Sequence, residues 1–248
     1  MRKFKIILCV SMIALVVLGA ATVGVLAMNN RLWFQIKEET DAYIFPTEFE
    51  KRPETNEEWV AVYQIPEDIL KNMSTDGLIE TCLNYPLYFN MIFYSSLQYG
   101  FDKTVQEFNG LQELSNREDA GVKLCELYRK VDLNDVVKSG DTYALRMRFM
   151  EYIIAQQSIL EKMNKDVRSE LFNECMERLQ IKFEKYPDTF AADSTLLIMG
   201  RIAQLDNEGF AVYAEKNEKI QVFLKDAALP EMSEEELTDL LRILGIEI

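Results

Sequence analysis

Apolar side chains recur at intervals of three and four residues from Glu57 onward, and alternating apolar and polar runs are nearly absent. This interval matches the 3.6-residue turn of an α-helix and places the apolar side chains on one face of it. The clearest stripes span residues 89–108, 145–163, 167–186 and 210–224, with further leucines at 237–244. The sequence therefore predicts an all-α fold, an array of about eight to ten helices joined by short loops.

Helix start and stop signals agree with this period. In the stretch IPEDILKNMSTDGLIETCLNYP, residues 65–86, a Ser, several acids and a Cys suggest an active site at first reading. Pro66 and Ser74, however, fit the starts of two helices, and the acids lie where helix dipoles favour negative charge. A similar phrase, LPEMSEEELTDLL, recurs near the end of the sequence. This recurrence is typical of stacked helical pairs of the HEAT type, although two fragments do not define a period.

Residues 1–27 predict export. MRKFK is a basic start, and residues 6–27 follow without a charge and end in small or aliphatic side chains. Such a segment is either a signal peptide cleaved after Ala27 or an uncleaved membrane anchor, because about 20 apolar residues span a bilayer. In both cases the positive-inside rule places the remainder outside the cytoplasm. We expect residues 28–58 to be a linker or entry segment and residues 59–248 to form a single helical domain.

The chain is strongly acidic. It has 27 Lys and Arg against 41 Asp and Glu, a formal net charge of -14, and part of the basic content lies in residues 1–27. An acidic surface repels phosphate backbones, which argues against nucleic acid as a partner. The same field favours another exported protein, or a cationic peptide or surface.

Cysteine usage fits export without a disulfide framework. Cys82, Cys125 and Cys175 are widely spaced, and each lies within a helical apolar pattern. We predict that they are small buried hydrophobic residues, although one disulfide between two of them is compatible with the sequence.

The sequence argues against most catalytic chemistries. It contains no histidine, which removes imidazole-dependent nucleophiles and His-ligated zinc. It has no CxxC pair and no glycine-rich phosphate loop, and DLNDVVKSGD lacks the spacing of an EF-hand, so we expect no cofactor and no metal. A pair of carboxylates remains, as in glycoside hydrolases. The candidates near apolar stripes are Glu80, Glu113, Glu151 and Glu174.

Four tyrosines form a second candidate site. Tyr85, Tyr88, Tyr94 and Tyr99 cluster between two predicted helix starts. Such amphipathic rings occur both between packed helices, with their hydroxyls at the rim, and at binding surfaces. The sequence leaves both interpretations open, and we treat the four as a candidate partner surface.

Part of the sequence resembles a block that recurs in a group of exported bacterial proteins for which no function is known. The matching positions are Ile65-Pro66, Met73-Ser74-Thr75, Leu78, Tyr85-Pro86, Phe108-Asn109-Gly110, Glu113-Leu114, Arg117, Asp119-Ala120 and Tyr128. The resemblance implies export and a helical fold, and it implies no activity, cofactor or catalytic residue. From the residues themselves, Asn109-Gly110 predicts a helix break, and Glu113 with Arg117 predicts a solvated i,i+4 ion pair.

These observations favour an exported or anchored helical binding module that does not catalyse a reaction. One alternative is a carboxylate-dependent hydrolase of glycans or cell-wall polymers. Another is a mainly structural protein of the cell envelope.

Overall fold

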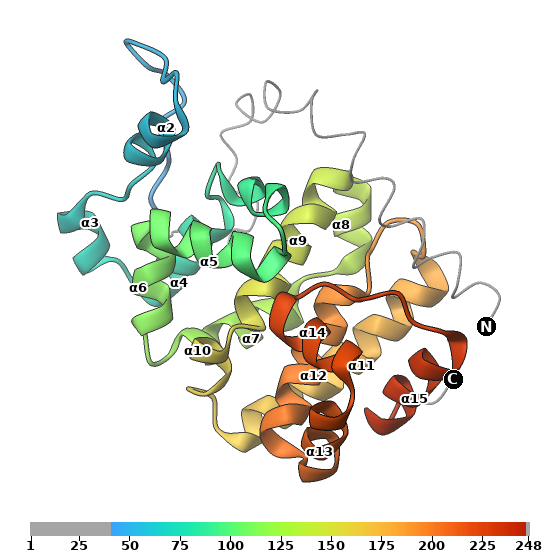
Figure 1. Ribbon diagram of the computed structural model, residues 1–248. Helices are drawn as coiled ribbons and strands as arrows, with labels where there is room; N and C mark the ends of the chain where they lie inside the picture. The colour runs from blue at the N-terminus through green and yellow to red at the C-terminus, as the bar shows by residue number, and fades with distance from the viewer. Residues whose placement is uncertain (1–40, 247–248) are drawn as a thin grey trace. The chain divides into compact units, whose positions relative to one another are not determined.

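The computed structural model describes residues 41–246, apart from the side chain of Glu234 (Figure 1). The predicted signal peptide or anchor, its cleavage after Ala27 and the first part of the predicted linker lie outside the described residues. Within residues 41–246 the chain forms fourteen α-helices, one 3-10 helix and no strand, which confirms the all-α prediction. Among these helices, none combines the length and the apolar character that a membrane span requires.

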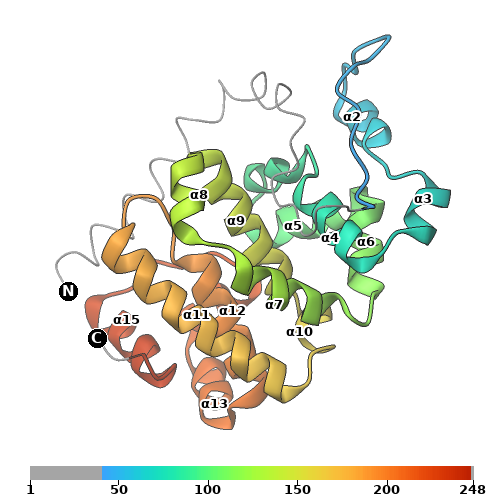
Figure 2. The same ribbon diagram turned by 180° about the vertical axis from the view of Figure 1, so that it is seen from behind.

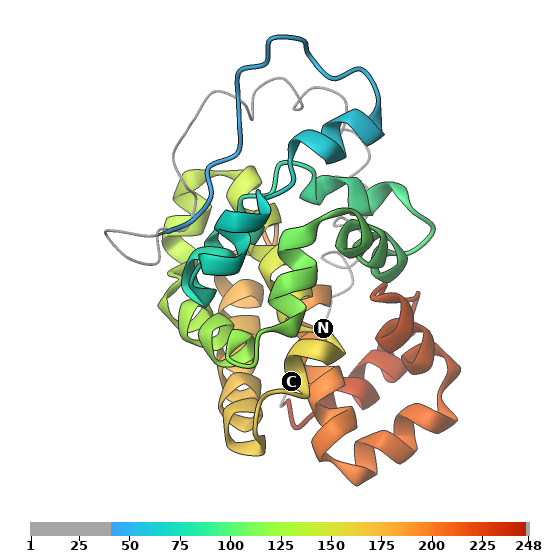
Figure 3. The same cartoon turned by 90° about the vertical axis from the view of Figure 1, so that its left-hand side faces the viewer.

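The described residues divide into two compact units, 41–130 and 131–246. The sequence predicted a single helical domain over residues 59–248, whereas the contacts within the chain divide after Lys130. Residues 41–55 contain no helix and follow the blue path in Figure 3, as expected of an entry segment. The HEAT-type pairing of helices stays a prediction.

Seven helices form the unit 41–130. They are α2 (Asn56–Val62), α3 (Glu67–Asn72), α4 (Thr75–Leu83), η2 (Tyr88–Phe93), α5 (Leu97–Glu107), α6 (Asn109–Asn116) and α7 (Ala120–Lys130). Side chains cap several of their starts, because the first backbone N–H groups of a helix lack partners within it. Thr55 and Glu58 form a reciprocal capping box at α2, and the Ser74 hydroxyl accepts a hydrogen bond from Gly77 N at the start of α4. The helix start predicted at Ser74 is thus confirmed.

Helix α4 is the core of this unit. Leu78, Ile79 and Leu83 are fully buried, and α4 packs against α6 and α7. The entry segment is fastened to its start, where Ser74 N and Oγ each donate to the Asp41 carboxylate at 2.6 Å. A Cβ at position 77 would lie 1.9 Å from Asp41 Oδ1, so this close approach requires glycine.

The amide side chains of Gln64 and Asn109 connect the α2–α3 junction to the α5–α6 junction by hydrogen bonds. Asn109 Oδ1 accepts a hydrogen bond from Ile65 N at 3.0 Å, and Asn109 Nδ2 donates to Ile65 O at 2.7 Å. Gln64 forms the reciprocal bonds: its Oε1 accepts a hydrogen bond from Asn109 N, and its Nε2 donates one to Glu107 O. These bonds satisfy backbone groups at two helix ends.

Aromatic rings pack next to these hydrogen bonds. Tyr85 stacks on Phe108 with ring centroids 4.0 Å apart, and Phe45 of the entry segment packs against both rings. Phe45 is buried, Tyr43 N donates to Thr81 Oγ1, and Ile44 is exposed. The entry segment is therefore held by its aromatic residue Phe45 and by its backbone at Tyr43, and the Tyr85 and Phe108 rings belong to the core.

Eight helices form the unit 131–246. They are α8 (Leu133–Ser139), α9 (Asp141–Ile154), α10 (Gln157–Leu160), α11 (Lys165–Lys185), α12 (Asp193–Asp206), α13 (Glu208–Lys216), α14 (Glu218–Asp226) and α15 (Glu234–Ile243). Helix α12 lies at the centre, with Leu197, Ile198 and Met199 fully buried, and packs against α9, α11, α13 and α14. Figure 2 shows the long helix α11 beside α12. The apolar stripe 167–186 is thus one helix, as its period predicted.

The stripes 89–108, 145–163 and 210–224 are interrupted, which raises the number of helices above the eight to ten expected. Asn217 ends α13 and begins α14, because its side-chain oxygen accepts a hydrogen bond from Ile220 N. Asn207 does the same between α12 and α13. A capping amide supplies a partner for an otherwise unbonded N–H, so two helices meet with no loop between them. The apolar period continues through such a junction and does not reveal it.

The three cysteines are buried thiols. Cys82 and Cys175 are fully buried, Cys125 is nearly so, and none of the three forms a disulfide. Burial raises the pKa of the Cys82 thiol well above its ordinary value. A neutral thiol in an apolar setting is unreactive, which agrees with the predicted packing role.

Candidate functional site

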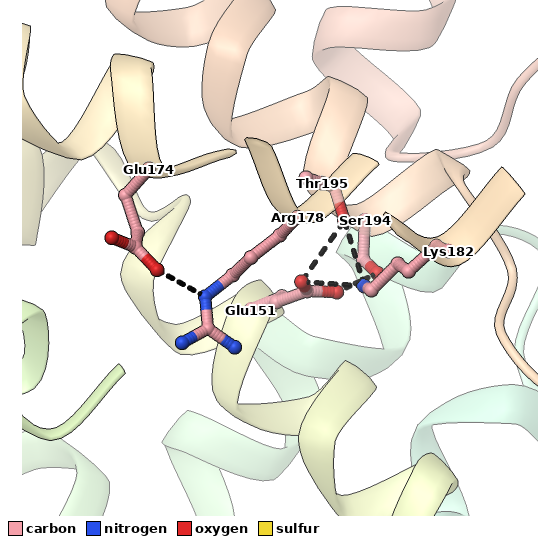
Figure 4. A network of polar contacts seen from close by, with 6 residues as sticks. All are labelled: Glu151, Glu174, Arg178, Lys182, Ser194 and Thr195. Atoms are coloured by element: carbon pink, nitrogen blue, oxygen red, sulfur yellow. Dashed lines mark hydrogen bonds and ion pairs between the residues drawn. The ribbon is translucent and has the colours of Figure 1, made fainter. Parts of the chain in front are cut away.

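One of the four candidate acids lies in a buried polar cluster of the unit 131–246. Glu151 of α9 accepts hydrogen bonds from Lys182 Nζ at 2.7 Å, Thr195 Oγ1 at 2.9 Å and Ser194 Oγ at 2.5 Å. Lys182 Nζ of α11 also donates to Thr195 Oγ1 at 2.8 Å. Figure 4 shows the Glu151 carboxyl group facing the ammonium group and the two hydroxyls. Three helices therefore converge on one ion pair.

Further charged side chains adjoin this cluster. Arg178 Nε donates to Glu174 Oε1 at 2.6 Å within α11, and Arg148 of α9 pairs with Asp193 of α12. Burial acts to lower the pKa of Arg148, but the carboxylate of Asp193 outweighs it and the pKa is raised. This second ion pair joins α9 to α12.

The buried cluster contains groups that could serve catalysis if a substrate reached them. A lysine beside a hydroxyl can act as a base, and a carboxylate can position it. However, Lys182 is 2% exposed, and Glu151, Ser194 and Thr195 are 0% exposed. Every one of these side chains is already engaged by another. We therefore interpret the cluster as an ion pair that orients α9, α11 and α12.

The other candidate acids do not form an open pair. Glu80 of α4 is fully buried, and Glu113 of α6 accepts a hydrogen bond from Arg117 Nε at 2.7 Å. Arg117 also donates to Leu70 O, so the predicted solvated pair is in fact half-buried and ties α6 to the end of α3. In Figure 4 the carboxyl groups of Glu151 and Glu174 face different cations. The structure brings none of these acids into direct contact with another.

The four tyrosines separate into two pairs. Tyr85 and Tyr88 are buried, whereas Tyr94 is half-buried and Tyr99 is 47% exposed. Burial, followed by the charges of Glu107 and Tyr63, raises the pKa of Tyr85 far above its ordinary value. Tyr94 and Tyr99 meet edge to face with ring centroids 5.6 Å apart. The packing interpretation therefore fits the first pair, and only the second reaches a surface.

Two phenylalanines extend this surface. Phe93 at the end of η2 is 70% exposed, and Phe89 meets it edge to face at a centroid distance of 6.2 Å. We call Phe89, Phe93, Tyr94 and Tyr99 the aromatic surface. Single exposed apolar side chains are common on protein surfaces, whereas a group of exposed aromatic side chains is typical of a binding site.

The backbone of η2 and α5 fixes the aromatic surface in place. A Cβ at Gly100 would lie 2.0 Å from Met91 O, so glycine allows α5 to approach the backbone of η2 closely. Ser96 caps α5 by accepting a hydrogen bond from Tyr99 N, and Asn90 donates to Asn56 Oδ1 at the start of α2. The rings are thus carried by η2 and by the start of α5, whose backbones are in close contact.

No family model, curated protein or solved structure shows a significant similarity to this chain. The functional argument therefore rests on the residues of the aromatic surface and of the buried cluster.

The sequence did not identify Phe89 and Phe93 as site residues, because they fit the four-residue stripe 89–108 and were assigned to a helix core. The structure places them in a 3-10 helix, whose three-residue turn directs the side chains differently. One signal could have identified them. Residues 81–101 contain no charged side chain, in a chain with 27% charged residues.

The stretch DLNDVVKSGD forms helix α8 and its caps. Asp132 accepts a hydrogen bond from Asn134 N at the start of α8, and Asp135 pairs with Lys138. Within residues 41–246, no group of three or more Cys, Asp or Glu side chains is placed to hold a metal ion.

Proposed function

We propose that this protein is an extracytoplasmic binding module that recognises another exported protein through the aromatic surface. The observation that supports this most directly is the exposure of Phe93 at the end of η2 and of Tyr99 in the first turn of α5, where Gly100 packs against the η2 backbone. The residues of 1–27 support export, either as a cleaved signal or as an anchor.

The composition around the aromatic surface also supports a protein partner. The buried centres of protein interfaces are enriched in Tyr, Phe and Met and depleted of charge. The aromatic surface has this composition, since its four rings are partly or largely exposed and come from residues 81–101, which carry no charge. Aromatic side chains in such a setting commonly supply most of the binding energy.

The carboxylate hydrolase receives less support. Its two catalytic acids must flank a substrate and therefore reach solvent at a suitable separation. Glu80 and Glu151 are buried, and Glu113 and Glu174 are each bonded to an arginine. The geometry thus favours binding over hydrolysis.

Site-directed photo-crosslinking in the producing cell tests the proposal. A photoreactive phenylalanine analogue is introduced at position 93 or, as a matched control, at position 69. Ile69 on α3 is also exposed but lies outside the aromatic surface. We expect a discrete adduct with one protein from position 93 and none from position 69. Equal adducts at both positions, or none at position 93, would contradict the proposal.

A further inference from the structure

We infer that the aromatic surface binds a basic amphipathic segment of the partner, which places apolar side chains on the rings and Arg or Lys side chains beside them. This inference rests on the proposed function and names the chemistry of the partner. It is based on a cation–π contact that one of the rings already makes within the chain and on the acidic side chains near the rings.

A ring of this surface already accepts a cation. Lys103 Nζ lies 5.6 Å from the centroid of the Tyr99 ring. Such cation–π contacts contribute about 0.5 to 1 kcal/mol at exposed sites and more when water is excluded. Phe93 is more exposed than Tyr99 and has no cation above it among the described contacts. It can therefore accept a guanidinium or ammonium group from a partner.

Carboxylates border the uncharged surface. Asp102 of α5 is exposed and accepts one hydrogen bond from Gln98. Glu107 lies at the end of α5, the helix that also carries Tyr99. Burial, followed by the negative charge of Glu107, raises the pKa of Tyr94. Glu57 is exposed at the start of α2, next to the Asn56 side chain that Asn90 contacts.

The wider charge distribution agrees with this rim. Residues 41–130 contain 16 acidic and 8 basic side chains, and none of the charges lies between residues 81 and 101. An apolar centre with an acidic rim is complementary to a segment that has apolar and basic residues side by side. A second copy of this chain would bring two acidic rims together, and an anionic lipid surface would be repelled. A neutral glycan would form no ion pair with the acidic side chains.

Peptide binding to the intact purified protein tests the inference. The probe is a fluorescent amphipathic peptide of about 16 residues with Leu on one face and Arg on the other. Matched peptides replace every Arg by Gln or by Glu. We expect the Arg peptide to bind at least about tenfold more tightly than the Gln peptide at about 0.1 M salt. The Glu peptide should bind more weakly still.

Variants of the protein locate the site. Phe93→Ala combined with Tyr99→Ala should weaken binding of the Arg peptide at least about tenfold, whereas the control Ile69→Ala should leave it unchanged. Asp102→Asn combined with Glu107→Gln should weaken it less and should reduce its dependence on salt.

Equal binding of the Arg and Gln peptides, or no binding of either, would overturn the inference. So would an unchanged affinity in the Phe93→Ala, Tyr99→Ala variant. A discrete crosslink from position 93 would in those cases still support the proposed binding function, so the two ideas fail separately.

Discussion

The charged side chains of this protein contribute to stability according to whether their ion pairs are buried or exposed. Lys182 and Glu151 are buried and bonded to each other, whereas Lys71 and Glu67 form an ion pair at 2.8 Å that is mostly exposed. A buried charge that loses its partner costs far more than an exposed one, because water cannot replace the partner. The sequence identified Glu151 as a candidate acid, but nothing in it indicated that Lys182, 31 positions away, would be its partner.

The buried pair gives the first prediction. Lys182→Met leaves the Glu151 charge without a cation and should lower the free energy of unfolding by about 3 to 5 kcal/mol. Adding Glu151→Met should recover part of that loss, because two apolar side chains replace the pair, although the buried Ser194 and Thr195 hydroxyls then lose their acceptor. Urea unfolding followed by circular dichroism measures both effects. The control Lys71→Met should cost less than about 1 kcal/mol, and an equal cost at positions 71 and 182 would show that burial of the pair is unimportant.

Another ion pair gives a prediction about pH. Arg168 of α11 donates two hydrogen bonds to the Asp206 carboxylate, at 2.7 Å and 2.6 Å, and these bonds lower the pKa of Asp206. A depressed folded-state pKa contributes stability above the unfolded pKa of about 4, and that contribution is lost as pH falls through the folded-state pKa.

Asp206→Asn should therefore lower the free energy of unfolding by about 1 to 3 kcal/mol at pH 7. The difference from the unmodified protein should shrink at a pH of about 3 or below. Urea titrations at the two pH values measure it, with the exposed Asp188→Asn as control. A difference that is the same at both pH values would argue against this ion pair as its source.

The spacing of apolar residues correctly predicted the helices that bury one continuous apolar face along their whole length. Helix α11 was predicted over its whole length, whereas the stripes 89–108 and 210–224 were predicted as continuous helices and are not. The spacing of apolar residues does not show where a helix ends. The break at Asn217 arises because its side chain accepts a hydrogen bond from the backbone N–H of Ile220. The break before Ser96 depends on the 3-10 turn of η2, which the period does not distinguish from an α-helix.

The candidate site was predicted only in part for the same reason. Tyr94 and Tyr99 were identified because four tyrosines lie close in sequence, and two of these four proved to be core. Phe89 and Phe93 were missed because they fit a helical stripe. Exposure depends on which elements pack against a turn, and this is a tertiary property that composition does not contain.

The close contact between η2 and α5 gives a prediction about one element. Gly100→Ala would push the backbone of η2 away from α5, because the added Cβ would collide with Met91 O. We expect a loss of about 1 to 3 kcal/mol in the free energy of unfolding and a clear drop in crosslinking from position 93. Gly209→Ala is the control, since its added Cβ would approach only Asn207 Oδ1, at 3.2 Å. If Gly100→Ala left crosslinking unchanged, the backbone contact would not be what positions the surface.

For the protein as a whole, the separation of charge from aromatic content is the feature most relevant to binding. The chain has a formal net charge of -14, yet residues 81–101 are uncharged and contain both members of the exposed pair Phe93 and Tyr99. The buried ion pairs of residues 131–246 stabilise helices, and the aromatic surface of residues 41–130 is the part suited to binding. Fold stability and partner binding should therefore respond to different substitutions.

The mass of the assembly that contains this protein tests the binding role most directly. The protein is released gently from the producing cells, and its mass is measured by size-exclusion chromatography with light scattering, in parallel with the Phe93→Ala, Tyr99→Ala variant. We predict a mass above that of one chain for the unmodified protein and the mass of one chain for the variant, with the same helical circular dichroism in both. A single-chain mass for the unmodified protein, or an equally large assembly for the folded variant, would contradict the account.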